Sequence, residues 1–408
     1  MISMPISEIS KRVSSGLTPL RSNPEFWLNG TISWLKTEQL GEKFIYSTTE
    51  KISAVAFRKT SIKIYPPNTL SIAMYGEGKT RGNVSIIKSE MATNQACCNI
   101  ELVPELADFE YVYYFLKTQY NELRNLSSGV RKNLNSEDIK NFVIRLPQEL
   151  TDQKKIAAVL SALDAKIDCN NRINAELEAM AKALYDYWFV QFNFPDANGK
   201  PYKFSGGKMV YNTTLKREIP EGWNSGSLWE VARYFNGLAM QKLRPIGSDY
   251  LPVIKIKEMG EGISDSTEKA RPDIPQEAII DDGDVLFSWS ATLDVKIWSG
   301  GKGALNQHIF KVTSDKYPKI FYYFELLAYL SHFKMMAEKR KTTMGHITQD
   351  HLKQSRISIP PIELLSRAHE KINPILQKHL LHEKENQQLT QLRDWLLPLL
   401  MNGQVTVA

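Results

Sequence analysis

The chain has 408 residues, of which 42% are hydrophobic and 24% are charged. These are ordinary globular values, so composition excludes a largely disordered, collagen-like or disulfide-scaffold protein, and the length suits two or three domains. Lysine plus arginine number 51 and aspartate plus glutamate 45, and the resulting net charge of +6 permits a polyanionic partner without demonstrating one.

Cysteine usage and hydropathy bound the cellular setting. Cys97, Cys98 and Cys169 lack zinc-site spacing, so we expect no structural metal and a reducing compartment. The N-terminus has no apolar export signal, and the longest apolar stretch, 320–333, is too short to span a bilayer. These features predict a cytoplasmic protein.

The first half of the chain is repeated in the second half. TNQACCNI, with Asn94 and Gln95, returns as LNQHIFKV, with Asn306 and Gln307, at an offset of 212 residues. LNSEDIKNFVIRLP (134–147) then returns as ITQDHLKQSRISIP (347–360) at nearly the same offset. Such ordered self-similarity predicts two duplicated domains.

Each copy begins with short β-rich runs between turn residues. In copy one these runs are 62–65, 70–74 and 84–88, and an aromatic helix follows at 109–120. In copy two the runs are 285–289, 295–298 and 309–312, and the aromatic helix is 317–333. We therefore predict an α+β fold with two repeated mixed α/β domains.

A long helix is predicted to close each copy. From an N-cap at Thr151 or Asp152, apolar residues recur at alternating steps of four and three, which is typical of a coiled-coil seam. Asn170 and Asn174 interrupt the first seam and Asn386 the second, and polar seam residues specify register. We expect two paired spacer helices of ~50–60 Å, the alternative being amphipathic helices packed on their own domains.

These elements give four segments. They are a first domain at 1–150, a central helix at 151–192, a connector with the second domain at 193–361, and a C-terminal helix at 362–408. Gly, Pro, Lys, Asn and Ser dominate 193–223, so composition alone leaves open whether the connector is flexible or ordered.

Two enzyme motifs are incomplete. AMYGEGKT (73–80) approximates a phosphate-binding loop, but a strand-like RGNVSII follows where the motif needs a helix. Pro272 and Asp273, followed by Asp294 and Lys296, loosely match a Mg²⁺ nuclease pattern in which two carboxylates hold the metal. Copy one has no counterpart, so a self-sufficient nuclease is only the alternative hypothesis.

Polar turns at equivalent places in the two copies are candidate DNA contacts, because Arg and Asn can pair with base edges and Lys with phosphates. The alternative is solvated turns with incidental charges. The candidates in copy one are Lys79, Arg81, Asn83, Arg131 and Lys132. Those in copy two are Ser288, Trp289, Ser290, Thr292, Lys296, Lys339, Arg340 and Lys341.

Long stretches of the chain carry a family resemblance. They are GKTRGNV after SIAMYGE, ALNQHIFKV, the helix QKKIAAVLSALDAKIDCNNRINAELEAMAKALYDYWF, the tract from GKPYKFSGGKMV to REIPEGW (199–223), and QLRDWLLPLLMNGQV. Over nearly its whole length the sequence resembles the specificity subunits of type I restriction-modification systems.

The resemblance implies two target recognition domains, each reading one half of a bipartite DNA site, held apart by the antiparallel helices. It also implies docking of two methyltransferase subunits and recruitment of restriction subunits, in the cytoplasm of a bacterium or archaeon. S-adenosylmethionine for DNA adenine methylation, and ATP with Mg²⁺ for the endonuclease, would belong to those partners. The chain itself is then expected to bind no cofactor and to catalyse nothing, and a protein-only coiled-coil adaptor is a further alternative.

Overall fold

The computed structural model describes residues 1–76, 80–126, 133–339 and 346–407. The chain divides into two compact units. The first holds Met1–Ile167 and Leu389–Ala408, and the second holds Asp168–Gln388. Each unit therefore contains one part of each long helix.

A five-stranded sheet forms the centre of the first unit. Its order is β2-β9-β6-β7-β4, with β4 parallel to β7 and the other pairs antiparallel. The strands are β2 (Ser10–Ser15), β4 (Phe44–Ile45), β6 (Leu70–Ala73), β7 (Val84–Ile87) and β9 (Cys97–Leu102). Buried side chains of this sheet pack against the aromatic helix α2 (Phe109–Thr118), whose first turn is capped by Asp108.

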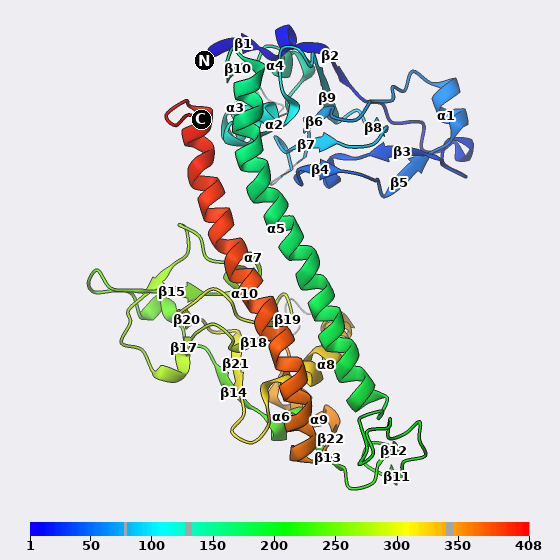
Figure 1. The fold of residues 1–408 in the computed structure, drawn as a ribbon, viewed down its shortest axis with the longest axis vertical. Coiled ribbons are helices and arrows are strands. Elements are labelled where there is room, and N and C mark those ends of the chain that lie inside the picture. The colour runs from blue at the N-terminus through cyan, green and yellow to red at the C-terminus, as the bar shows by residue number, and fades with distance from the viewer. Residues whose placement is uncertain (77–79, 127–132, 340–345, 408) are drawn as a thin grey trace. The chain divides into compact units, whose positions relative to one another are not determined.

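Smaller elements complete the first unit (Figure 1). A second sheet has the order β5-β3-β8. Its strands are β3 (Ile32–Leu35), β5 (Glu50–Ile52) and β8 (Ala92–Thr93). A separate antiparallel pair joins β1 (Ile2–Pro5) to β10 (Val143–Leu146). The remaining short helices are α1 (Ala54–Lys59), α3 (Tyr120–Asn125) and α4 (Ser136–Lys140).

The second unit repeats this plan. Its central sheet has the order β14-β21-β18-β19, and a smaller sheet has the order β16-β15-β20-β17. The central strands are β14 (Arg233–Asn236), β18 (Val285–Ser288), β19 (Asp294–Ile297) and β21 (Ile309–Thr313). The smaller sheet contains β15 (Leu251–Ile254), β16 (Lys269–Ala270), β17 (Ile279–Ile280) and β20 (Gly303–Leu305). The pair β13 (Asn224–Ser227) and β22 (Arg356–Ile359) corresponds to β1 and β10.

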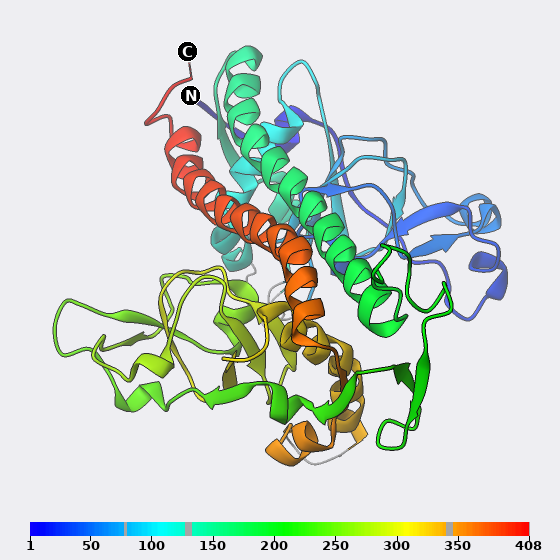
Figure 2. The same ribbon diagram turned by 60° about the horizontal axis from the view of Figure 1, so that its bottom comes forward.

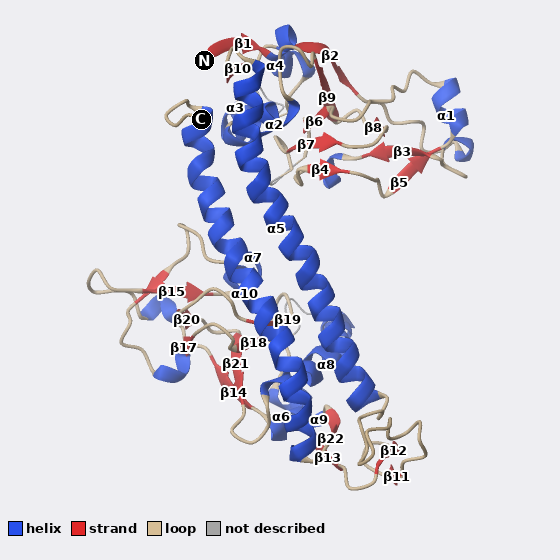
Figure 3. Ribbon diagram, viewed as in Figure 1, coloured by secondary structure: helices blue, strands red, loops and turns tan. Residues whose placement is uncertain are grey.

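The helices follow the same repeat (Figure 3). Those of the second unit are α6 (Leu228–Val231), α7 (Ile256–Glu261), α8 (Lys319–Lys339) and α9 (Gln349–Gln354). In each unit an aromatic helix is followed by a short helix that begins with a capping box, formed by Asn135 in α4 and by Thr348 in α9. The predicted α+β fold with an internal repeat is confirmed.

Two long helices close the two repeats. Helix α5 (Leu150–Tyr185) has 36 residues and helix α10 (Ile362–Met401) has 40. Within each unit their segments lie side by side and antiparallel (Figure 2). Helix α5 begins at Leu150, so the predicted cap at Thr151 or Asp152 is wrong, and both residues lie in the first turn.

Some of the other local predictions are confirmed and others are wrong. Five of the six predicted strand runs contain strands, but 62–65 does not, because Tyr65 makes only an isolated bridge to Met91. Helix α10 ends at Met401, before the predicted limit of 408, and a turn containing Gly403 follows it. None of the described helices is long and apolar enough to cross a membrane.

The segment that follows α5 is ordered within the second unit. Its aromatic rings stack on one another, with Phe194 at 4.7 Å from Tyr202 and 5.5 Å from Trp223 between ring centroids. A hairpin of β11 (Met209–Asn212) and β12 (Arg217–Pro220) lies within it. Burial of these rings answers the question that composition left open, since they belong to the apolar core of the second unit.

Candidate nucleic-acid interface

The segment between β6 and β7 holds three of the five candidates of the first unit, Lys79, Arg81 and Asn83. Arg81 is half-buried, and its Nε has no hydrogen-bond partner among the residues described. Asn83 instead uses its amide internally, donating from Nδ2 to the Leu40 carbonyl at 3.1 Å. Lys79 lies outside the described residues. Among the described candidates of this hairpin, Arg81 thus has polar capacity left for a partner.

The β18–β19 hairpin confirms the turn predicted in the second copy, and burial separates its candidates. Ser288 is fully buried, and its hydroxyl bonds to the Thr292 carbonyl at 2.6 Å and accepts from the Asp294 N–H at 2.8 Å. Ser290 is also buried, whereas the Thr292 side chain is exposed. The two serines therefore shape the turn from inside, and Thr292 faces solvent.

The other two candidates of this hairpin are half-buried. Lys296 donates from Nζ to the Met259 carbonyl at 3.3 Å. Trp289 donates from its indole Nε1 to the Asn236 Oδ1 at 2.9 Å, and its ring lies 5.1 Å from that of His308 and 5.5 Å from that of His346. Sequence reasoning selected Trp289 but missed its three neighbours, because they come from separate segments.

The basic clusters can be placed only in part. Arg131, Lys132, Arg340 and Lys341 lie outside the described residues, and Lys339 is the last residue of α8. Their phosphate-binding role stays a prediction.

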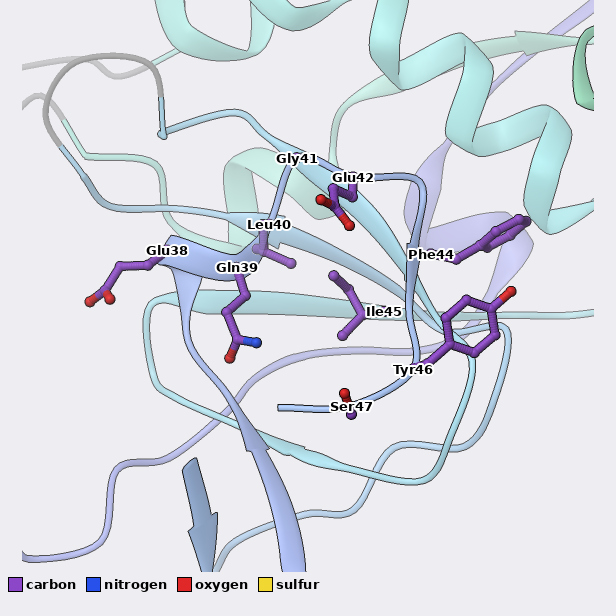
Figure 4. Close-up of a pocket in the computed structure, with 9 residues that line it drawn as sticks. All are labelled: Glu38, Gln39, Leu40, Gly41, Glu42, Phe44, Ile45, Tyr46 and Ser47. Atoms are coloured by element: carbon purple, nitrogen blue, oxygen red, sulfur yellow. The ribbon is translucent and has the colours of Figure 1, made fainter. Parts of the chain in front are cut away.

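An open hollow of about 530 Å³ lies beside the first hairpin. Figure 4 shows it lined by the loop from Glu38 to Ser47, with the rings of Phe44 and Tyr46 next to each other. Because Glu38 and Glu42 both lie on its rim, the hollow itself is a poor place for a phosphate, which like charges repel. Asn83 holds this loop against the hairpin, so it positions the rim.

The sequence patterns also did not indicate that Arg21 stacks on two tryptophans. The Arg21 guanidinium lies 3.8 Å from the Trp27 ring centroid and 4.8 Å from that of Trp34. Hydrogen bonds from Arg21 and then from Lys36 lower the pKa of Glu50, since both favour its charged form. The ion pair between Arg21 and Glu50, which begins β5, holds the guanidinium beside the smaller sheet and partly neutralises its charge.

A close backbone approach marks the same place in both units. A Cβ added to Gly16 would lie 2.1 Å from the backbone oxygen of Thr93, and one added to Gly237 would lie 2.1 Å from the backbone oxygen of Asn306. In each unit this glycine passes the Asn-Gln segment that reveals the repeat. The signal in the sequence was only the dipeptide Gly-Leu, recurring at 16–17 and 237–238.

The seam asparagines lie inside the helix pair of the second unit. Asn170 is fully buried and donates from Nδ2 to the Asn386 Oδ1 at 2.9 Å and to the Glu385 carboxylate at 2.8 Å. Asn174 contacts His382, with 3.0 Å between its Oδ1 and the imidazole Nδ1. Of the predicted polar seam residues, Asn170 thus meets Asn386 across the helix pair, whereas Asn174 meets His382 instead.

A partly buried charge network fastens the helices of the first unit to its sheet. Lys43 donates from Nζ to the Glu110 carboxylate at 3.1 Å and to the Ser161 hydroxyl at 2.9 Å. On the same helix as Ser161, Asp164 receives Arg393 of α10 at 3.0 Å. Burial and then the Asp164 carboxylate raise the pKa of Tyr114, which completes the network as a neutral donor.

The nuclease alternative gains no support from the placement of its residues. Asp273 lies between β16 and β17 of the smaller sheet, and its carboxylate pairs with the Arg271 Nε at 3.2 Å. Asp294 instead begins β19 of the central sheet. Lys296 is directed to the Met259 carbonyl. Among the residues that the structure describes, no group of three histidine, cysteine or acidic side chains is arranged to hold a metal ion.

Comparison with known proteins bears on both units. Residues 3–179 and 220–391 match the family described as type I restriction modification DNA specificity domain. The type I restriction enzyme MjaIX specificity subunit of Methanocaldococcus jannaschii is 26% identical over 410 residues, which cover 97% of this chain and 91% of the relative. The HindI specificity subunit of Haemophilus influenzae is 22% identical over 335 residues, or 68% of this chain and 72% of the relative.

A solved structure shares the fold. The type I restriction-modification S subunit from M. genitalium superposes with a TM-score of 0.59 at 16% identity, covering 98% of this chain and 95% of the other. The resemblance noted from the sequence is confirmed. Because the family match extends over both repeated units and most of the chain, the chain belongs to the type I restriction-modification DNA specificity family.

Proposed function

We propose that this chain is the DNA-recognition subunit of a type I restriction-modification complex, in which each repeated domain reads one half of a bipartite site. The observation that carries the proposal is the duplication itself. The order β2-β9-β6-β7 in the first central sheet corresponds to β14-β21-β18-β19 in the second, the two hairpins are equivalent, and each copy matches the DNA specificity family. Two similar readers on one chain suit a site with two specific halves.

The proposed contacts concentrate at the two hairpins. Arg81 in the first unit, and Thr292 with Trp289 in the second, are the candidates with exposed surface or unused polar atoms. Lys296, the clusters 131–132 and 339–341, and Lys79 would contact phosphates. We expect R81A to weaken recognition of one half-site only, because its hairpin belongs to one reader.

The long helices would set the gap between the two half-sites. At 1.5 Å per residue, the 36 residues of α5 extend ~54 Å. The proposed segments are recognition domains at 1–150 and 193–361 with spacer helices at 151–192 and 362–408. Deleting one heptad from α5 should change the unspecified gap or prevent assembly, whereas unchanged spacing with full activity would count against a spacer.

Partners supply the chemistry in this proposal. Two methyltransferase subunits would dock on the chain and use S-adenosylmethionine, and restriction subunits would use ATP and Mg²⁺. The complex would act in the cytoplasm. This chain would contribute base recognition and geometry and no catalytic step.

The decisive experiment is single-molecule methylome sequencing of cells that express this chain with its neighbouring methyltransferase subunit. Cells with the methyltransferase alone are the control. A split motif with a fixed gap, present only when this chain is expressed, is the expected result. If both proteins are made and associate but no motif depends on this chain, the proposal fails.

A further inference from the structure

One backbone frame supports the hairpin tip in the first unit. Directly after β6, the Met74 N–H donates to the Ala96 carbonyl at 2.8 Å. The Met74 carbonyl in turn accepts from the Leu134 N–H at 3.1 Å. Met74 is therefore held from both sides, by the loop before β9 and by the segment before α4.

The second unit has the same frame with different residues. Directly after β18, the Trp289 N–H donates to the His308 carbonyl at 3.2 Å, and the Trp289 carbonyl accepts from the Ile347 N–H at 2.9 Å. Trp289 thus occupies the place of Met74, and His308 that of Ala96. The strand alongside ends at Ser15 in one unit and at Asn236 in the other, each just before the closely packed glycine.

The side chains on this frame differ completely in chemistry. In the first unit Met74 and Ala96 are buried, and the Ser15 hydroxyl lies 2.9 Å from that of Ser136. In the second unit the half-buried Trp289 ring packs against the imidazoles of His308 and His346. Its indole N–H donates to Oδ1, the side-chain amide oxygen of Asn236. Equivalent backbone hydrogen bonds that carry different polar side chains are what two readers of different bases require.

Internal packing does not account for these groups. His308 has φ at 80°, a conformation that L residues other than glycine seldom adopt. The Nδ1 atoms of His308 and His346 are buried without a hydrogen-bond partner among the described residues, an arrangement that costs stability. The Asn236 side chain is exposed, and the bond from Trp289 fixes its amide plane while leaving its two N–H donors available.

We propose that Asn236, Trp289, His308 and His346 form the base-reading group of the second unit. Asn236 contacts the edge of a base that offers an acceptor beside a donor, as adenine does in the major groove: its Nδ2 donates to the acceptor, and the second lone pair of Oδ1 accepts from the donor. Trp289 is a positioning residue that aims the Asn236 amide, and the two imidazoles hold the indole ring. The inference rests on the proposed function and assigns its second half-site to these side chains.

The test is the base preference of methylation in cells that express the full chain with its methyltransferase subunit. We expect N236A to relax one position in one half of the motif, raising methylation of sites with another base there about tenfold. W289F keeps an aromatic ring but lacks the indole N–H, so it should relax the same position to a smaller extent. Neither variant should alter the other half or the gap.

S15A is the matched control, because Ser15 occupies the equivalent place in the first unit and should leave this half of the motif unchanged. Since Asn236 is exposed, N236A should unfold at the wild-type temperature, which separates lost recognition from lost folding. If N236A and W289F retain the wild-type base preference at every position, or relax both halves equally, the inference is overturned. If the unmodified chain yields no motif at all, the proposed function falls and this inference falls with it.

Discussion

A carboxylic acid inside the second unit predicts a pH-dependent stability. Glu325 of α8 accepts a hydrogen bond from the Tyr185 hydroxyl at 2.7 Å, where α5 ends among aromatic rings. Burial raises the pKa of Glu325 from its ordinary 4.5 to about 7, against smaller opposing effects of the Tyr185 hydrogen bond and Arg217. The folded chain therefore disfavours the ionised form.

The sign and size of the effect follow from this pKa. Since the folded value lies above the unfolded one, stability falls as the pH rises from about 4.5 to about 7 and is constant beyond that. One pKa unit corresponds to ~1.4 kcal/mol, so the upper limit is roughly 3 kcal/mol. Solvent reaches part of the Glu325 side chain, which reduces the expected cost to about 2 kcal/mol.

The perturbation is E325Q, which preserves the shape and the acceptor for Tyr185 but cannot ionise. We expect E325Q to stabilise the chain by about 2 kcal/mol at pH 8 and to have little effect at pH 4.5. Urea unfolding followed by tryptophan fluorescence is suitable, because Trp188 and Trp223 lie in the same aromatic cluster. Equal free-energy changes for E325Q at pH 4.5 and pH 8 would refute the reasoning.

Three further predictions concern contacts within single units. N386A should destabilise the second unit by about 1–3 kcal/mol in urea unfolding, because it removes a hydrogen-bond partner of buried Asn170. The double variant N170L/N386L should recover much of that loss, because it removes both polar groups. Equal losses of stability in the two variants would contradict the predicted role of the hydrogen bond. K43M should lower the unfolding free energy of the first unit by about 2 kcal/mol, since it leaves the partly buried Glu110 carboxylate without its cation while Asp164 keeps Arg393, and a loss under 0.5 kcal/mol would count against that network. G237A should abolish folding of the second unit as followed by circular dichroism, because the added Cβ would clash with the backbone of Asn306. G260A should be neutral or slightly stabilising, because Gly260 lies in a helix with open space around it. Comparable behaviour of the two variants would disprove the close approach at Gly237.

Local patterns in the sequence were sufficient for much of the fold. The repeat, the hairpins and the long helices each leave a signal within one window of sequence, as alternation, turn residues or a seam. The strand predicted at 62–65 failed because Pro66 and Pro67 follow directly, and proline cannot donate to a ladder. Tyr65 accordingly makes only an isolated bridge.

The candidate interface was harder to predict than the fold. Hairpin tips can be found from sequence, but composition does not say which polar side chains of a tip point inward. Ser288 and Ser290 are buried while Thr292 is exposed, a difference that arises in the turn between β18 and β19, where Ala291 has φ at 54°. Asn236 and His346 come from segments far apart in the chain, so only tertiary structure brings them to Trp289.

The short outer strand pairs have a topological consequence. Ile2 of β1 lies opposite Leu146 of β10, four residues before α5 begins at Leu150, and Asn224 of β13 lies opposite Ile359 of β22, just before α10. Paired residues in antiparallel strands have Cα atoms about 4.5–5.5 Å apart, so each domain enters and leaves through neighbouring points. An insertion or deletion between the paired ends would therefore leave the connection from each domain to its long helix unchanged, while the apolar contacts between the domain and that helix still have to match.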